Sequence, residues 1–278
     1  MCVLLSRKSV MLDQIQSPIA TFKNLRVEFE TKDGTVVGVE DVSFEINPGE
    51  TVCIVGESGS GKSVSSLSMM RLVEFGGGRI SGGELIFDRK NGDKVDVVKT
   101  NASLMRTIRG NEIGMIFQEP MTALNPVFTV ERQLTEGLRL HKKLSKAQAR
   151  AKAMELLHEV RIPEPERRIK QYPHELSGGM RQRVVIAMAM ACEPRLLIAD
   201  EPTTALDVTI QAEILALMDR LKRETGTAVM FITHDMAVVA QMADRVVVMY
   251  KGKKVEEGSV EAIFENPQHE YTKSLLAA

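Results

Sequence analysis

The sequence predicts an α/β protein with a mostly parallel sheet, an N-terminal antiparallel β subdomain and an inserted α-helical subdomain. Early strand patterns alternate between apolar and polar residues, as in antiparallel sheets with one solvated face. Later strand patterns are continuous apolar runs, as in parallel sheets that helices cover on both faces. Helical patterns separate these runs, and a stretch without any strand pattern, at about residues 121–175, marks the insert.

The alternating strands come first along the chain. Residues 26–30 and 42–46 each alternate with a period of two, and Asp33 with Gly34 provides a turn between them. The continuous apolar runs predict buried strands at residues 52–55, 114–117, 196–199, 229–232 and 246–249.

Two helices have clear end signals. Ser145 with Gln148 three residues later forms a capping box, and Pro163 and Pro165 end the helix that it opens. Gly226 is a natural stop for the second helix. The apolar residues of that second helix fall on one face: Ile210, Ile214, Leu217, Met218 and Leu221.

Composition and charge exclude several classes of protein. The formal net charge is −1 and no basic stripe is present, which disfavours direct nucleic-acid binding. Cys2, Cys53 and Cys192 lie far apart, which argues against a disulfide framework and fits a reducing cytoplasm. We expect Cys53 and Cys192 to be buried, inert thiols. No apolar run approaches the ~20 residues that a membrane-spanning helix needs.

A glycine-rich segment follows the apolar run 52–55 and precedes a helical pattern. Its glycines let backbone N–H groups surround phosphates, and the start of the helix adds partial positive charge. Lys62 can reach the β- and γ-phosphates, and the Ser63 hydroxyl suits Mg²⁺. The phosphate-binding pattern is complete and comprises Gly56, Glu57, Ser58, Gly59, Ser60, Gly61, Lys62 and Ser63.

Two acidic residues follow the apolar run 196–199. Ligands of open α/β sheets bind at the carboxyl ends of the strands, so these carboxylates should face the same ligand as the glycine-rich loop. We expect Asp200 to hold Mg²⁺, directly or through water, and Glu201 to polarise the attacking water. Together with the loop, these residues predict a P-loop NTPase (RecA-like) core that uses ATP and Mg²⁺.

Ser177, Gly178 and Gly179 predict a second anion site, because Ser177 is a good N-cap and the glycines expose backbone N–H groups. Residues 176–180 resemble the signature sequence of the ABC ATPases, with Met180 where Gln is usual. The resemblance implies that the signature of one cassette closes over the γ-phosphate held by the loop of another. The alternative interpretation of Ser-Gly-Gly is a flexible turn.

Other residues resemble further positions of that family. Gln118 resembles the glutamine that senses Mg²⁺ and water, and residues 205–207 resemble the loop that contacts the opposite cassette. His234 resembles the switch histidine of the γ-phosphate, although a histidine after a buried strand is also commonly structural. Phe29 falls where a ring stacks on adenine, although an alternating strand would bury it in any case. The catalytic roles implied by the resemblance therefore fall on Glu201, His234, Gln118 and Lys62.

The resemblance covers residues 19–278 and narrows to one branch of importers. The segments that resemble oligopeptide, dipeptide and nickel importers are residues 118–126, 172–176 and 200–209. The segments that resemble the N-terminal cassette of the glutathione importers are residues 128–130, 161–164 and 187–189. Residues 266–272 resemble the start of a C-terminal extension, so we expect a shortened chain or an isolated half.

The resemblance implies one ABC ATPase domain at residues 19–278, after a disordered leader at residues 1–18. The leader has its apolar patch before its charges, the reverse of a signal peptide. The expected parts are a nucleotide-binding core at residues 19–120 and 176–250, a helical subdomain at 121–175 and a C-terminal tail at 251–278. In that last part we expect a small strand, a helix near residues 260–264 and then a tail.

The resemblance also implies partners and a location. The chain would power uptake of peptides or glutathione, with nickel or another oligopeptide-branch cargo as the alternative. Its expected partners are a second cassette (identical, different or fused), two membrane-spanning permease subunits and, indirectly, a periplasmic or extracellular substrate-binding protein. It would lie on the cytoplasmic face of the bacterial inner membrane as a peripheral subunit. Residues 119–126 are the expected wall of the groove that receives the permease.

Sequence features disfavour three rival functions. A soluble ABC ATPase of DNA repair or translation usually carries a long coiled-coil insertion or basic patches, whereas the insert here is short. A kinase or GTPase is disfavoured by the signature segment and His234. A cassette that binds ATP only structurally is disfavoured because Glu201 and His234 are both present.

Overall fold

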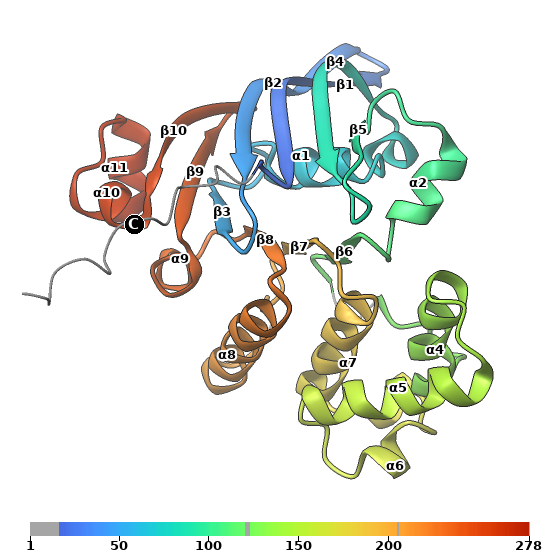
Figure 1. Ribbon diagram of the computed structural model, residues 1–278. Helices are drawn as coiled ribbons and strands as arrows, with labels where there is room; N and C mark the ends of the chain where they lie inside the picture. Colours follow the sequence, from blue (N-terminus) through green and yellow to red (C-terminus); the bar gives the residue numbers. More distant parts are fainter. Residues whose placement is uncertain (1–16, 120–122, 205, 278) are drawn as a thin grey trace, which may run out of the picture.

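The computed structural model describes residues 17–119, 123–204 and 206–277. These residues form two sheets, one above the other, with most of the helices below the larger sheet (Figure 1). Residues 1–16 of the expected leader lie outside the described part of the chain. The α/β architecture with an antiparallel N-terminal sheet is therefore confirmed.

The upper sheet is antiparallel, with the strand order β2-β1-β4-β5. Its strands are β1 (Ala20–Thr31), β2 (Gly34–Ile46), β4 (Gly78–Asp88) and β5 (Lys94–Asp96). The rings of Phe22 and Phe44 stack across β1 and β2 with centroids 4.2 Å apart. The sequence did not predict β4, because Gly78, Gly82 and Gly83 interrupt its alternation.

The larger sheet has the order β10-β9-β3-β8-β7-β6, and all neighbours except β10 and β9 run parallel. Its strands are β3 (Thr51–Val55), β6 (Ile113–Ile116), β7 (Leu196–Asp200), β8 (Ala228–Ile232), β9 (Arg245–Tyr250) and β10 (Lys253–Ser259). Each of the five expected apolar runs forms one of these strands, which confirms the predicted parallel sheet.

Strand β3 shows why the sequences of these strands are continuous apolar runs. Val52 and Ile54 belong to the core between the two sheets, which also includes residues of α1. Cys53 and Val55 belong to the second core, between the larger sheet and the helices below it. Because both faces of the strand are buried, residues 52–55 are apolar without alternation. The chain therefore has one core on each side of the larger sheet.

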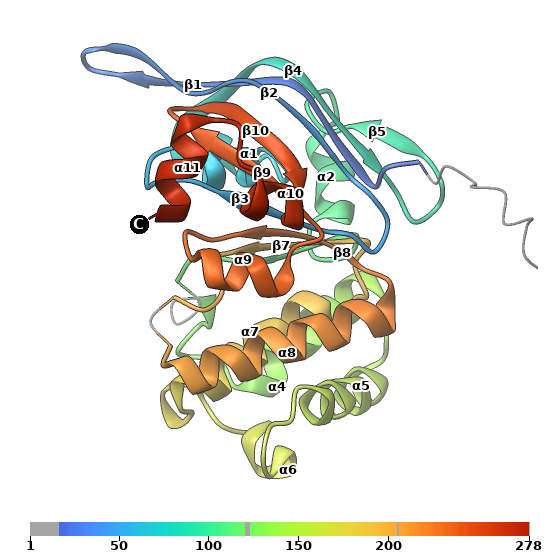
Figure 2. The ribbon, with the colours of Figure 1, turned by 90° about the vertical axis from the view of Figure 1, so that its left-hand side faces the viewer.

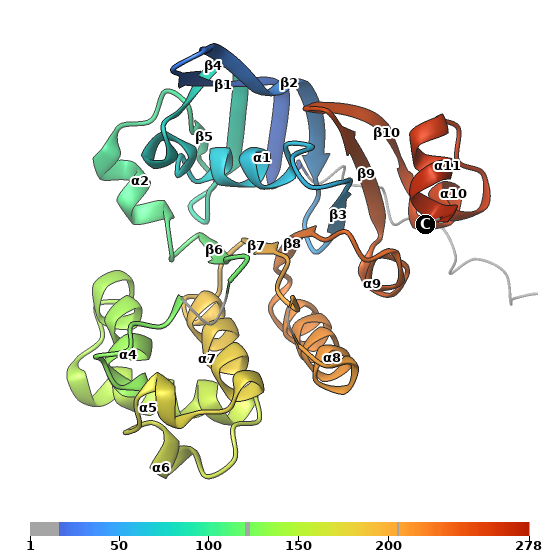
Figure 3. The same cartoon turned by 180° about the vertical axis from the view of Figure 1, so that it is seen from behind.

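The helices occupy both cores, and Figure 3 shows α1 between the two sheets. Those of the first half are α1 (Lys62–Met69), η1 (Val73–Gly76), α2 (Ala102–Ile108), α4 (Val130–His141), α5 (Lys146–Glu159) and α6 (Pro165–Arg168). Those of the second half are η2 (Pro173–Glu175), α7 (Gly178–Met190), α8 (Val208–Thr225), α9 (Met236–Met242), α10 (Val260–Glu265) and α11 (Glu270–Ala277).

The predicted start of α5 and the predicted end of α8 are confirmed, whereas α5 already ends at Glu159, before Pro163, and Pro165 opens α6. The Ser145 hydroxyl accepts from the Gln148 N–H, and the Gln148 side chain accepts from the Ser145 N–H, so α5 opens with a full capping box. Gly226 ends α8 with a φ of 67°, which is the left-handed conformation that glycine adopts without strain.

Helix α7 joins the helical insert to the sheet. Figure 2 shows α7 and α8 crossing below the larger sheet, with α5 and α6 farther from it. Helix α7 packs against α4 and α5 as well as against β6. The expected boundary between insert and core, at residue 175, falls just before α7. Because α7 contacts both parts, these contacts do not divide the chain there, and the boundary stays a prediction.

The end of the chain, for which only a tail was expected, forms a helix. Helix α11 packs beside β9 and β10 (Figure 2), and its Thr272 is fully buried. The expected helix near residues 260–264 is present as α10. Helix α11 depends on tertiary contacts, such as the stacking of Tyr271 on Tyr250 of β9, which a local sequence pattern does not show.

The two cysteines within the described residues are buried and free, as predicted. Burial in the apolar core raises the pKa of the Cys53 thiol far above its ordinary value. Burial also raises the pKa of Cys192. Both thiols are therefore protonated at neutral pH and unreactive.

Candidate active site

The glycine-rich loop connects β3 to α1. At two of its positions, Gly56 and Gly61, any side chain would collide with neighbouring main-chain atoms. Gly56 has a φ of 149°, and a Cβ atom there would lie 2.1 Å from the main-chain oxygen of Met249. Gly61 has a φ of 96°, and its Cβ would lie 2.8 Å from the oxygen of Gly38. The sequence places glycines here because the loop backbone turns sharply against neighbouring strands.

Lys62 lies inside this loop at the first position of α1. Its side-chain Nζ donates to the main-chain oxygens of Gly56 at 2.7 Å and Glu57 at 2.8 Å, and the residue is only 6% exposed. Burial lowers the pKa of Lys62, while the nearby carboxylates of Glu201 and Asp200 oppose that effect. The loop therefore holds a cation surrounded by main-chain oxygens.

Asp200 ends β7 directly opposite the start of α1. The Ser63 hydroxyl donates to Asp200 Oδ1 at 3.1 Å, and Asp200 is 4% exposed. Burial raises the pKa of Asp200, and the hydrogen bond from Ser63 opposes this effect. A hydroxyl beside a carboxylate is an oxygen-only donor pair that suits Mg²⁺.

Glu201 follows Asp200 and collects three hydrogen bonds. Its carboxylate contacts His234 Nδ1 at 3.1 Å, and it accepts from the Thr204 hydroxyl at 3.0 Å and from Gln118 Nε2 at 3.4 Å. Burial raises the pKa of Glu201, but the hydrogen bonds from His234, Thr204 and Gln118 outweigh it and leave this pKa below its ordinary value. The carboxylate is thus ionised at neutral pH.

The sheet explains why these residues meet. Gln118 comes shortly after β6, Glu201 follows β7 and His234 follows β8, and these three strands are parallel neighbours. The carboxyl ends of parallel neighbours lie at one edge of a sheet. The structure therefore brings together Lys62, Ser63 and the three residues at this edge.

The signature segment has a different environment. Ser177 is the N-cap of α7, and its hydroxyl accepts from the Met180 N–H at 3.3 Å. A Cβ atom on Gly179 would lie 3.2 Å from Ile210 of α8. Ser177 is exposed and Gly178 partly so, which leaves the helix start open to solvent. The anion-binding role of Ser177, Gly178 and Gly179 stays a prediction.

Two neighbouring predictions are covered only in part. Of residues 205–207, Ala205 lies outside the described residues, and Asp207 is the N-cap of α8. Of the expected groove wall, residues 120–122 lie outside the described part, Leu124 is buried and the Asn125 N–H donates to Gln133 Oε1 at 2.8 Å. The roles of both segments stay predictions.

Phe29 is partly buried in β1. A Cβ atom on Gly38 or on Gly78 would approach its ring to 2.8 Å, so the ring packs closely on the neighbouring strands β2 and β4. Packing in the core is therefore a sufficient reason for an aromatic side chain at this position. Stacking on adenine therefore stays a prediction.

Two residues near the site had no role assigned from the sequence. The Thr204 hydroxyl donates to the Glu201 carboxylate. The only sequence signal for this contact was that Thr204 lies in a turn three residues after Glu201. The Tyr271 hydroxyl of α11 accepts from the Glu57 N–H of the loop at 2.8 Å. No local pattern could predict that second contact, because the two residues lie in distant parts of the chain.

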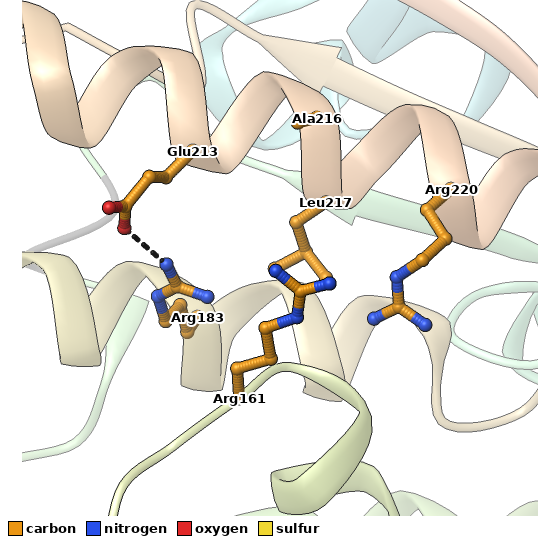
Figure 4. Close-up of a pocket in the computed structure, with 6 residues that line it drawn as sticks. All are labelled: Arg161, Arg183, Glu213, Ala216, Leu217 and Arg220. Atoms are coloured by element: carbon orange, nitrogen blue, oxygen red, sulfur yellow. Dashed lines mark hydrogen bonds and ion pairs between the residues drawn. The ribbon is translucent and has the colours of Figure 1, made fainter.

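A separate cavity of about 340 Å³ lies between α7, α8 and the end of α5 (Figure 4). Arg183 pairs with Glu213 at 2.7 Å and donates to the Val160 oxygen at 2.9 Å, and Arg220 donates to the Glu159 oxygen. Arginines that bind the last carbonyls of a helix stabilise its C-terminal end. This cavity therefore belongs to helix packing and contains none of the predicted site residues.

The family model described as "ABC transporter" matches residues 39–204. A Brucella melitensis protein named for peptide import and ATP binding is 56% identical over 261 residues, which cover 94% of this chain and 77% of the relative. The glutathione import ATP-binding protein of Escherichia coli K12 is 52% identical over 260 residues. That match covers 94% of this chain but only 42% of the relative.

Solved structures agree with the fold. An ATP-binding cassette, solved as a dimer in a post-hydrolysis state with ADP and Pi, has a TM-score of 0.75 and 28% identity. The match covers 87% of this chain and 98% of that cassette. Among the described residues, no helix is both long and apolar enough to cross a membrane.

Proposed function

The chain belongs to the ABC transporter family, and we propose that it binds and hydrolyses ATP to power an importer of peptides or glutathione. The observation that carries the chemistry is the meeting of the phosphate loop with Asp200 and Glu201 at one edge of the sheet. The names of the relatives support import and its cargo class.

Lys62 would bind the phosphates of ATP. Its ammonium is held by two main-chain oxygens of its own loop, which phosphate oxygens can replace. A phosphate anion is a stronger partner for an ammonium than a neutral carbonyl. Because phosphoryl transfer depends mainly on positioning and charge stabilisation, a buried lysine at this place contributes directly to rate.

Ser63 and Asp200 would hold Mg²⁺, and Gln118, whose Nε2 donates to Glu201 at 3.4 Å, is the third predicted ligand. Within the described chain, no group of three or more His, Cys, Asp or Glu residues could hold a metal by itself. This donor set fits Mg²⁺, which commonly uses one or two carboxylates together with substrate phosphates. The ion would neutralise phosphate charge.

Glu201 would accept a proton from the attacking water. Its lowered pKa keeps it ionised at neutral pH, as a general base requires. His234 and Gln118 hydrogen-bond to the same carboxylate, so both would orient it beside the γ-phosphate.

A second cassette would complete the site. The dimeric cassettes among the structural relatives support this arrangement. Ser177, Gly178 and Gly179 lie at an open helix start, where N–H groups can bind an anion presented by another chain. Two permease subunits, served by a periplasmic or extracellular substrate-binding protein, would anchor the pair at the cytoplasmic face of the inner membrane.

Glu201→Gln tests the chemistry in the purified protein. We expect ATP binding to stay near wild type and turnover to fall about 10²–10⁴-fold, since the variant keeps the side-chain shape but loses the base. Equilibrium binding of a fluorescent ATP analogue and phosphate release measure the two quantities. Near-normal turnover would remove Glu201 from this role.

Uptake in cells tests the cargo. Cells that lack the gene are supplied with labelled glutathione or a labelled dipeptide, and rescued with wild type or with Glu201→Gln. Selective loss of one uptake, restored by wild type alone, would establish ATP-driven import of that cargo. Normal uptake of both compounds would contradict the proposed cargo and direct the search to nickel or to a soluble role.

A further inference from the structure

The last helix of the described chain touches the phosphate loop. The hydroxyl of Tyr271 in α11 accepts a hydrogen bond from the main-chain N–H of Glu57 at 2.8 Å. Tyr271 is only partly exposed, and its ring lies against Tyr250 of β9 with centroids 4.2 Å apart. A tyrosine with a packed ring and a bonded hydroxyl is fixed at both ends.

The rest of the segment is anchored independently of the loop. The Glu256 carboxylate on β10 accepts from the N–H groups of Gln268 at 2.7 Å and His269 at 3.0 Å. These bonds tie the chain before α11 to the sheet with a charged acceptor, which makes them stronger than neutral pairs. The hydroxyl of Tyr271 is therefore presented to the loop from a rigid support.

Glu57 is also the residue that holds Lys62. Its main-chain oxygen accepts from Lys62 Nζ at 2.8 Å and from the Ser60 N–H at 3.2 Å. Tyr271 thus binds the N–H group of Glu57, while the C=O group of Glu57 binds Lys62 and Ser60 within the loop. A second C-terminal contact, from the Gly252 N–H to the Ser60 oxygen at 3.0 Å, supports the far side of the loop.

We propose that Tyr271 is a positioning residue that holds the phosphate loop in its nucleotide-binding conformation. The inference rests on the proposed function of the loop in binding ATP. A loop that is already ordered binds with its full affinity, whereas a loop that is ordered only part of the time loses affinity in proportion. The C-terminal helix is then part of the nucleotide site, although it lies outside the sequence motif.

Tyr271→Phe tests this role, because it removes the hydroxyl and keeps the ring stack. One neutral hydrogen bond corresponds to about a two- to tenfold change in an equilibrium. We expect the KM for ATP and the Kd of a fluorescent ATP analogue to rise by about that factor, with kcat changed by less than about twofold because Tyr271 touches no reacting group. The thermal midpoint without nucleotide should fall only slightly, by the contribution of one hydrogen bond, while the added stabilisation by ATP should also decrease.

Tyr250→Phe is the matched control, since it removes a hydroxyl from the other ring of the pair without touching the loop. It should bind ATP as wild type does. Equal KM in Tyr271→Phe and wild type, or a fall in kcat at unchanged KM, would overturn the positioning role.

Lys62→Ala separates this inference from the function on which it rests. If Lys62→Ala abolishes ATP binding while Tyr271→Phe binds like wild type, the loop binds ATP and Tyr271 does not position it. If Lys62→Ala binds ATP as well as wild type does, the proposed role of the loop itself is wrong.

Discussion

At the scale of single residues, the site depends on the environment of one carboxylate. Glu201 has a φ of 46°, the left-handed conformation that non-glycine residues rarely adopt. Its main-chain N–H donates to the Ile232 oxygen at 2.9 Å, which anchors that backbone to β8. Strained backbone is typical of functional positions, because surrounding contacts must hold it in place.

Thr204 controls how acidic Glu201 is. Because the Thr204 hydroxyl stabilises the ionised carboxylate, Thr204→Val should raise the pKa of Glu201 toward the value that burial favours. The base acts only when ionised, so activity on the acid side should be lost at higher pH than in wild type. The measurement is kcat for ATP hydrolysis as a function of pH.

The control for this experiment is Thr209→Val, on the exposed face at the start of α8. Its pH profile should match that of wild type. A Thr204→Val profile shifted toward lower pH would contradict the assignment, because it would mean that the hydroxyl favours the protonated acid. The stability contributed by ionised Glu201 should follow the same direction, being lost as pH falls through its lowered pKa.

At the scale of elements, the loop between β3 and α1 depends on backbone conformations that only glycine adopts easily. Gly56→Ala combines an unfavourable φ of 149° with a Cβ atom 2.1 Å from the Met249 oxygen. The loop must shift to relieve that contact, and it would then lose the conformation that we propose surrounds the phosphates. We expect ATP affinity to fall more than about tenfold, which equals about 1.4 kcal/mol. Calorimetric titration with ATP measures this loss.

Gly76→Ala, at the end of η1, is the matched control. Gly76 is not among the positive-φ glycines, and its Cβ would meet nothing within 4 Å. This variant should bind ATP normally and keep its thermal midpoint. Equal affinity in both variants would show that the loop tolerates a side chain at Gly56.

At the scale of the whole molecule, the proposed site is shared between two cassettes. Glu201→Gln with ATP and Mg²⁺ should double the molar mass seen by light scattering, because the nucleotide is bound but not hydrolysed. Adding Ser177→Asp should prevent this, since Asp still caps α7 but repels the phosphates of the other chain.

Adding Ser177→Asn is the control for the dimer experiment, because Asn caps the helix without a charge. That double variant should dimerise like Glu201→Gln alone. A monomer in every case would contradict pairing between identical chains and would imply a different or fused second cassette. Dimerisation of the Ser177→Asp form would place the signature outside the interface.

The sequence by itself determined the features that depend on local patterns. Alternation separated the antiparallel strands from the parallel ones, and the capping box at Ser145 and the stop at Gly226 set helix ends. The complete glycine-rich pattern predicted a phosphate-binding loop, and the structure places that segment between β3 and α1. These signals are readable because backbone conformation and burial repeat over a few neighbouring residues.

Only the tertiary structure decided which distant residues meet. It brought Gln118, Glu201 and His234 to one sheet edge, although the expected roles of Gln118 and His234 came from family resemblance alone. It also placed Tyr271 against Glu57 and turned the expected tail into α11. Such contacts follow from strand order and helix packing, which depend on the whole chain and leave no pattern among neighbouring residues.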